Sequence, residues 1–382
     1  MQILTVDIGT GTQDIFLYDS RLDIENGFKL VLPSPTMIIH RRLKEATRRG
    51  QAVLLTGVIM GGGPSAWAAE AHARLGLPVY ATPDAARSFN DDLEKVAATG
   101  IQIVSEDEAA RLPADVLRIE LRDFDFPAIA GAFAHFGISL DELQAVAAAV
   151  FDHGDAPSEI SDRQFRFDYL DERIRRHNRL SAFAFRAEEV PASMTRLQAV
   201  AQSARIQGGR LAELPLVVMD TAPAAVLGAS FDPQVSARQR QLIANIGNFH
   251  TLAFRLGPGG IEGVFEHHTG LLDRPKLEGL LRSLANGSLQ HSDVFGDHGH
   301  GALVYNPAPL DPTGVVVTGP RRSLLRGSAL NPYFAVPFGD MMIAGCFGLL
   351  SAAADLLPDL GEPIRRSLQS GATSGAAPWD LV

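Results

Sequence analysis

The amino-acid sequence predicts an α/β protein built from two lobes that face each other across a cleft. The chain has 382 residues, which is more than one ordinary hydrophobic core accommodates. Short apolar runs that suit buried strands alternate with segments whose apolar residues recur at helical spacing. Two strand–turn–strand units of similar design begin at Ile3 and Gln241, one in each half of the chain. Such an internal repeat indicates two related lobes.

The same patterns predict where the domains begin and end. We expect a first lobe at residues 1–214, a second lobe at 215–338, a helix that closes the fold at 339–366 and a flexible tail at 367–382. The first lobe carries a helical insertion, because apolar residues recur at three- and four-residue spacing from Arg163 to Arg205. The tail is rich in Gly, Ala and Ser, which favours mobility.

Composition excludes several classes of function. The net charge of −10 repels a phosphate backbone, so no nucleic-acid partner is expected. Cys346 is the only cysteine, which excludes a disulfide framework and an iron–sulfur cluster held by this chain. The segment Met1–Asp7 lacks the features of a secretory signal, and the apolar run Met341–Ala354 is too short to span a bilayer. We therefore expect no membrane partner and a cytoplasmic location.

The strongest local motif lies between Asp7 and Asp14. Asp7 ends an apolar strand, where its carboxylate can hold a hydrated Mg²⁺ ion. The turn that follows is suited to phosphate, because glycines allow a close backbone approach and threonines add hydroxyl donors. Its candidate ligand-binding residues are Gly9, Thr10, Gly11, Thr12 and Gln13. The alternative is an ordinary hairpin turn rich in Gly and Thr.

Five segments, in this order, resemble the ATP-binding elements of the actin-like ATPase superfamily, which includes actin, acetate and sugar kinases and the heat-shock chaperones. They are a first phosphate loop, a connecting helix, a second phosphate loop, an adenosine-binding strand and turn, and a second connecting helix. The matching residues are Asp7–Asp14, Asp220–Gly228, Asn245–Thr251, Val315–Pro320 and Gly339–Ala353.

This resemblance implies a ribonuclease H-like fold in each lobe, with ATP and Mg²⁺ bound in the cleft. It implies that Asp7 holds the metal, that Asp220 lies near the attacking water, and that Gly247, Asn248 and Gly319 contact the nucleotide. Three departures weaken the case for fast hydrolysis. Asn245 stands where relatives usually carry Asp, and Asn248 and Phe249 replace small glycines of the second loop. Pro320 replaces a glycine of the adenosine turn and removes a backbone donor.

Within this superfamily the chain resembles a family that often carries the name "pyruvate formate-lyase activating enzyme". The likeness rests on four short segments: Gly11–Asp14, Asp152–Gly154, Glu266–Thr269 and Gly299–Gly301. Radical chemistry of the kind in that name needs several cysteines for an iron–sulfur cluster, and this chain has one.

Histidines form a second set of candidates, because six of them fall at predicted strand ends or loops. They are His153, His250, His267, His268, His298 and His300. Asp152-His153-Gly154 and Asp297-His298-Gly299 repeat one tripeptide, and a His beside a carboxylate can act as a general base or a metal ligand. Asp152 and His153 are thus candidate catalytic residues. The alternative is that these histidines bond loop backbone or face solvent.

Three functions remain open from the sequence. The first is a Mg²⁺-dependent ATPase, phosphotransferase or activase-like enzyme that acts on an unknown small molecule or protein. The second is a ligand-binding protein that kept the fold without hydrolysis. The third is a His/Asp-assisted enzyme that acts in the cleft on a substrate other than a nucleotide.

Overall fold

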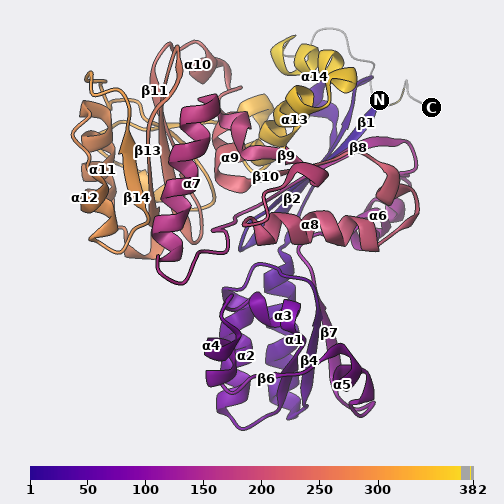
Figure 1. The fold of residues 1–382 in the computed structure, drawn as a ribbon. Helices are drawn as coiled ribbons and strands as arrows, with labels where there is room; N and C mark the ends of the chain where they lie inside the picture. Colours follow the sequence, from indigo (N-terminus) through magenta and orange to yellow (C-terminus); the bar gives the residue numbers. More distant parts are fainter. Residues whose placement is uncertain (371–378, 380–382) are drawn as a thin grey trace.

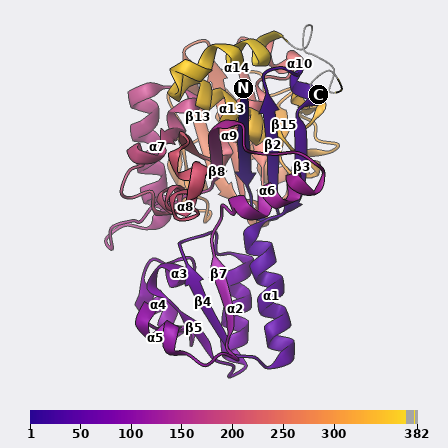
Figure 2. The same ribbon diagram turned by 90° about the vertical axis from the view of Figure 1, so that its right-hand side faces the viewer.

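The computed structural model describes residues 1–370 and 379. Within them the chain forms two six-stranded mixed sheets and one four-stranded parallel sheet. Each large sheet is the centre of one lobe, and the two lobes lie side by side. The small sheet belongs to a separate insert, which projects below both lobes in Figures 1 and 2.

The first lobe has the strand order β3-β2-β1-β8-β10-β9. Its strands are β1 Gln2–Ile8, β2 Thr12–Asp19, β3 Phe28–Pro33, β8 Leu143–Val150, β9 Ala184–Arg186 and β10 Leu216–Asp220. Its helices are α6 Phe126–His135, α8 Thr195–Ile206, α13 Ala344–Leu356 and α14 Pro358–Ser370. Alternate residues of β1, β2 and β8 pack against α13 and α14 on one face and against α6 and α8 on the other. Both faces are covered, so most side chains in the middle of the central strands are apolar.

The second lobe has the strand order β14-β13-β12-β11-β15-β16. Its strands are β11 Gln241–Ile246, β12 His250–Gly257, β13 Gly260–His268, β14 Gly301–Val304, β15 Val316–Thr318 and β16 Tyr333–Phe334. Its helices are α7 Asp162–His177, α9 Thr221–Ala229, α10 Pro233–Ser236, α11 Arg274–Asn286 and α12 His291–Phe295. Helix α11 covers one face of the sheet, and α7 and α9 cover the other.

The insert lies between β3 and β8 along the chain. Its parallel strands are β4 Val53–Gly57, β5 Val79–Ala81, β6 Gln102–Ile103 and β7 Leu117–Leu121. Its helices are α1 Pro35–Arg49, α2 Pro64–Arg74, α3 Pro83–Arg87, α4 Leu93–Ala98 and α5 Glu106–Arg111. It has a hydrophobic core of its own around Leu43, Leu55 and Ile119.

The two lobes repeat one topology. In the first, an antiparallel β3-β2-β1 meander continues into β8 and β10, which run parallel to β1. In the second, a β13-β12-β11 meander continues into β15 and β16, which run parallel to β11. This duplicated arrangement is the ribonuclease H-like fold of the actin-like ATPase superfamily, and the predicted fold class is confirmed.

Helices α9 and α13 connect the lobes and cross each other between them. Helix α9 leaves the first sheet and packs on the second, whereas α13 follows the second sheet and packs on the first. Their backbones approach closely at Gly228 and Gly348, where a side chain on either glycine would overlap the carbonyl group of the opposite helix. Small residues at this crossing therefore bring the two lobes together.

The structure corrects four of the expected divisions of the chain. The first lobe extends past residue 214, because β10 is buried and pairs in parallel with β8. The insertion is an α/β domain at residues 35–121, and the expected helical segment after Arg163 contains the short strand β9 and divides between the lobes. Two helices, α13 and α14, stand where one was expected. Residues 367–370 of the expected tail end α14, and 371–378 and 380–382 lie outside the described residues.

No helix within the described residues is both long and apolar enough to cross a bilayer.

Candidate functional site

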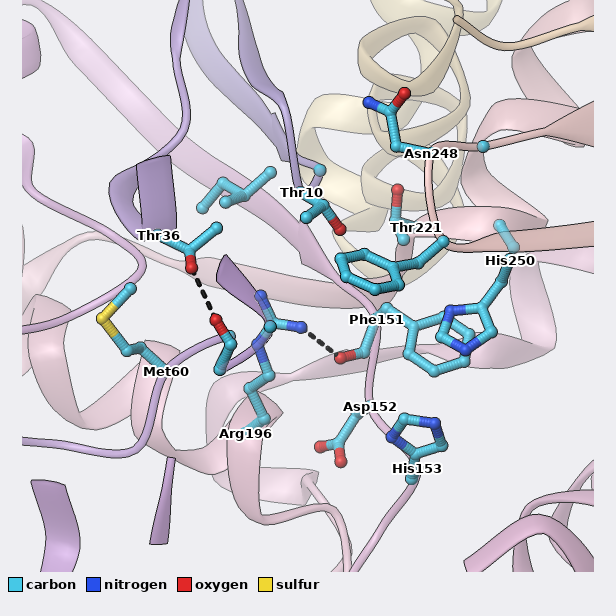
Figure 3. Close-up of a pocket in the computed structure, with 18 of the residues that line it drawn as sticks. Thr10, Thr36, Met60, Phe151, Asp152, His153, Arg196, Thr221, Asn248 and His250 are labelled. Carbon is cyan, nitrogen blue, oxygen red and sulfur yellow. Dashed lines mark hydrogen bonds between the residues drawn. The ribbon is translucent and has the colours of Figure 1, made fainter. Parts of the chain in front are cut away.

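A cavity of about 890 Å³ lies between the two lobes and the insert. The β1–β2 turn and the β11–β12 turn line it together, as predicted from the two repeated hairpins. Figure 3 shows Thr10 and Asn248 from these two turns near Thr221, with Phe151, His250 and His153 farther along the wall. The cavity therefore has a polar end between the turns and an end lined by histidine.

The two turns have the same backbone geometry. The N–H of Gly9 donates to the carbonyl oxygen of Thr12, and the N–H of Gly247 donates to that of His250, each at 2.9 Å. The turns also approach each other closely, because a Cβ atom on Gly11 would lie 2.6 Å from Nδ2 of Asn248. Glycine at position 11 thus lets the two loops meet.

Asp7 and Asp14 are neighbours across β1 and β2 at the polar end of the cavity. Burial raises the pKa of Asp7 to about 7, although Thr221 Oγ1 donates to Asp7 Oδ1 at 2.5 Å. Burial and the nearby Asp7 raise the pKa of Asp14 to about 8, and Oδ1 of Asp14 has no hydrogen-bond partner. Two buried carboxyl groups without a cationic partner are suited to a bound dication.

Asp220 lies outside the cavity lining, which differs from the place that the resemblance implied. It is buried, pairs directly with the Arg166 guanidinium and caps α9 by accepting from the Ala222 N–H at 3.1 Å. Arg166 also donates from Nε to Glu266 at 3.1 Å. Because Arg166 comes from α7, far away in the sequence, a prediction from local motifs could not include this pair. The next residue, Thr221, lines the cavity instead.

The remaining predicted nucleotide-binding residues divide between two locations. Gly9, Thr10, Gly11, Thr12, Asn245, Gly247, Asn248 and Gly319 all line the cavity. Gln13 does not, since its amide donates to the carbonyl oxygen of Pro33 at 3.1 Å. Gly319 has φ of +95°, and a Cβ atom there would lie 2.5 Å from Asn245 Oδ1. The turn after β15 therefore packs directly on the second loop.

Four of the six candidate histidines gather in one cluster. One ring nitrogen from each of His153, His250 and His300 lies within 4.8 Å of the others. The His268 ring is 4.7 Å from the His300 ring and 5.1 Å from the His250 ring, measured between centroids. Burial, followed by the neighbouring imidazoles and arginines, lowers the pKa of His153 and His250 far below its usual value and that of His300 to about 2. These three rings are therefore neutral at physiological pH.

The other two histidines lie apart from this cluster. His267 is buried, and its Nε2 lies 3.1 Å from Asp297 Oδ2, while its Nδ1 donates to the His268 carbonyl oxygen at 3.2 Å. His298 is exposed on a turn with φ of +63°. The repeated tripeptide thus brings His153, but not His298, to the cavity. The histidine that joins His153 is His300, two residues farther on.

Asp152 lines the cavity and also stabilises its wall. Its carboxylate accepts from the N–H of Gly154 at 2.8 Å and from the N–H of Leu197 in the first turn of α8 at 2.9 Å. Burial raises the pKa of Asp152. Because both oxygens are engaged by the backbone, the carboxylate fixes the His153 loop against α8.

Several residues that shape the site are not among those predicted from the sequence. Asp14, Thr221, Phe151, Phe249, Arg166 and Glu266 belong to this group. Asp14 could have been found, because antiparallel pairing around the turn places it opposite Asp7. The others depend on contacts between distant segments, for which the sequence has no local signal.

One protein family matches most of the chain in sequence. Residues 60–324, more than half of the chain, match the family described as "Putative pyruvate format-lyase activating enzyme (DUF1786)". The chain belongs to this family. No curated protein matches it in sequence.

Solved structures provide remote similarities. One is the activator of the 2-hydroxyisocaproyl-CoA dehydratase from Clostridium difficile with bound ADPNP, at 10% identity over 99% of this chain and 100% of that chain, with a TM-score of 0.33. Another is a ROK hexokinase from Thermus thermophilus, at 12% identity over 97% and 87%, with a TM-score of 0.24. A third is a propionate kinase from Francisella tularensis, at 8% identity over 97% and 87%, with a TM-score of 0.26.

Proposed function

We propose that this protein binds a nucleoside polyphosphate together with Mg²⁺ in the cleft between its lobes, as an ATPase, phosphotransferase or activase-like enzyme with slow intrinsic turnover. The observation that carries the proposal is the meeting of the two hairpin turns across one cavity, with Asp7 and Asp14 buried side by side at its polar end. Backbone donors on both sides and carboxylates beneath them are what a metal–polyphosphate complex requires.

The metal is central to this proposal because the polar end of the cavity, where phosphate would bind, is poor in basic side chains. Among the described residues that line the cavity, the lysine and arginine side chains are those of Arg87, Lys95 and Arg196. The first two belong to α3 and α4 of the insert, and Arg196 is paired with Asp123 at 2.7 Å. Phosphate charge between the turns would then be balanced by Mg²⁺, held by Asp7 and Asp14 and otherwise by water.

The residues near Asn245 offer a place for the base and sugar. Gly319 and Pro320 line the cavity beside Asn245, together with Met341 and Met342. Methionine side chains adapt to a flat aromatic ring and favour contact with its face or edge. Pro320 has no N–H to donate, so recognition here would depend on packing more than on hydrogen bonds.

Slow turnover follows from two features of the site. Asn245 is uncharged, and Asp220 is paired with Arg166 and does not reach the cavity. Among the described residues that line the cavity, neither the β11–β12 turn nor α9 then offers a carboxylate to orient an attacking water. A protein that binds nucleotide without hydrolysis is the alternative that these two residues favour. The His-lined end favours the other alternative, a His/Asp-assisted enzyme that acts on a substrate other than a nucleotide.

The test is calorimetric titration of ATP and ADP with and without Mg²⁺, beside a phosphate-release assay. We expect binding that depends on Mg²⁺ and a loss of about 10- to 100-fold in affinity for Asp14→Asn, since a charge-assisted contact contributes about 1.5–3 kcal/mol. Asp107→Asn is the matched control, because Asp107 is exposed on α5 and does not line the cavity. Absence of binding for every adenine and guanine nucleotide at millimolar concentration would refute the proposal.

A further inference from the structure

We propose that His153, His250 and His300 form a binding site for a divalent transition-metal ion such as Zn²⁺, distinct from the Mg²⁺ site proposed above. The three residues come from separate segments: the loop after β8, the start of β12 and the residue before β14. One ring nitrogen from each lies within 4.8 Å of the others. Within the described part of the chain, no other group of three or more His, Cys, Asp or Glu residues meets this condition.

His300 provides the independent observation that points to a ligand. Its side chain is fully buried, and neither ring nitrogen has a hydrogen-bond partner in the protein. Leaving a buried polar group unpaired costs about 1–3 kcal/mol, so such groups usually have a partner. A metal ion bound to one nitrogen of His300 would supply that partner.

Glu266 lies where a metal-binding histidine needs support. Its Oε1 is 3.5 Å from His300 Nδ1, and this oxygen also lacks a hydrogen-bond partner. Its Oε2 accepts from Arg166 Nε at 3.1 Å, which fixes the carboxylate in place. A carboxylate that accepts from the second ring nitrogen of a ligating histidine is the usual outer arrangement of zinc sites. With Nδ1 of His300 directed at Glu266, Nε2 is left to face the metal.

Aromatic packing orients the other two rings. Phe151 stacks on His250 with 4.1 Å between ring centroids and an angle of 11°, and its edge contacts His153 at 4.7 Å. His153 in turn stacks on His300 at 5.3 Å. Zinc–nitrogen bonds of about 2.0–2.1 Å require the nitrogens to draw closer than 4.8 Å. His153 and His250 are only partly buried, and a rotation of these two rings would bring their nitrogens to the ion.

The guanidinium beneath the histidines is neutralised by carboxylates. The guanidinium of Arg166 is paired with two carboxylates, those of Asp220 and Glu266, so the buried group beneath the histidines has one formal negative charge in excess. Imidazole nitrogen is a preferred ligand of Zn²⁺, Co²⁺ and Ni²⁺ rather than Mg²⁺. The chemistry of the donors thus separates this site from the all-oxygen site of Asp7 and Asp14.

The ion would face the cavity. His153, His250 and His268 line the cavity wall, whereas His300 lies behind them. Three protein ligands with one position open to a cavity are typical of catalytic zinc sites, whereas structural sites have four protein ligands. An ion held here would present its open position to a small ligand at the histidine-lined end of the cleft.

The experiment measures metal content and affinity without reference to activity. Protein purified without a polyhistidine tag is loaded with Zn²⁺ or Co²⁺ in excess Mg²⁺, dialysed, and analysed by mass spectrometry and by cobalt absorption in the visible range. We expect about one equivalent of Zn²⁺ per chain, a four- or five-coordinate cobalt spectrum, and loss of both in His153→Ala, His250→Ala and His300→Ala. Glu266→Gln should weaken binding by about 10- to 100-fold.

Control variants distinguish loss of this metal site from loss of the nucleotide site and from misfolding. His135→Ala and His298→Asn change exposed histidines outside the cluster, and Asp14→Asn changes the Mg²⁺ site, so all three should keep the metal. His153 and His250 are only partly buried, so their variants are expected to fold even where His300→Ala does not. Wild-type protein that holds no transition metal after loading, or folded His153→Ala and His250→Ala variants that retain it, would overturn the proposal.

Discussion

Asp7 and Asn245 occupy equivalent positions in two copies of one hairpin. Asp7 pairs with Asp14 across β1 and β2, and Asn245 pairs with Leu252 across β11 and β12. Both carboxyl groups therefore lie on the first lobe, and the second lobe offers an amide and an apolar side chain at the same places. A metal ion between the turns would be held from one side only.

Restoring a carboxylate at position 245 tests this asymmetry. Asn245→Asp is expected to tighten Mg²⁺·ATP binding by about 10- to 100-fold and to raise phosphate release, because it adds a charge-assisted contact to the metal complex. Without Mg²⁺ the same change should weaken ATP binding through repulsion. Asn286→Asp adds the same charge at an exposed position on α11 and should change neither value. Wild type and both variants are titrated with ATP, with and without Mg²⁺. Equal affinities in all three proteins would contradict the prediction.

The stability of the metal-free protein should fall as the pH rises. The pKa of Asp7 is about 7 and that of Asp14 about 8, against 3.8 for an ordinary Asp carboxyl. Between about pH 4 and pH 7 the folded state keeps both protons and the unfolded chain releases them, so each group lowers the unfolding free energy by about 1.4 kcal/mol per pH unit.

Asp14→Asn should remove one of these two decreases in unfolding free energy. It should therefore leave the metal-free protein more stable than wild type at pH 8. Denaturant unfolding with chelator at pH 5, 6.5 and 8 measures the slope. A variant whose stability follows the wild-type pH dependence would show that Asp14 is ionised in the folded state.

Arg166 is expected to be essential for the stability of the buried ion pairs that it forms with Asp220 and Glu266 behind the histidines. Arg166→Ala leaves the buried carboxylates of Asp220 and Glu266 without their partner, which should cost about 3–5 kcal/mol. Arg175 lies on the same helix α7, is exposed and forms an i,i+4 pair with Asp171, so Arg175→Ala should change stability little. Chemical denaturation measures the unfolding free energy of both variants. Equal losses would contradict the prediction, because the buried ion pairs of Arg166 would then stabilise the protein no more than an exposed pair.

Phe249 should control how quickly a ligand enters the cleft. It stands where the first turn has Gly11, and its ring packs on Trp67 of the insert with 5.5 Å between centroids. Such aromatic contacts contribute about 0.5–1.5 kcal/mol, so Phe249→Ala should speed nucleotide exchange by about two- to tenfold. Trp67 fluorescence in a Trp379→Phe background reports the rate. Phe136→Ala, at an exposed position after α6, is the control. Unchanged exchange in Phe249→Ala would exclude a gating role.

The parts of the site that could be predicted are those encoded by short local patterns. Glycine and threonine after an apolar strand predict the turn at Gly9–Thr12, and the second copy at Gly247 predicts that two such turns meet. The repeated strand order follows from the same duplication. In each case a few adjacent residues set the backbone geometry.

Contacts between distant segments could not be predicted. The pairing of Arg166 with Asp220 spans 54 residues, and nothing near either one signals the other. The tripeptide around His298 was as suggestive as the one around His153, yet the left-handed backbone at His298 turns that residue to solvent and His300 inward. The insert was missed as a domain because two of its strands are very short: β5 has three residues and β6 has two.

The most direct test of the central claim is a crystal structure with a non-hydrolysable ATP analogue and Mn²⁺ in place of Mg²⁺, with anomalous data at the manganese edge. We predict polyphosphate between the Gly9–Thr12 and Gly247–Asn248 turns and a manganese peak beside Asp7 and Asp14. Nucleotide bound elsewhere, or no nucleotide in the cleft at saturating concentration, would contradict the account.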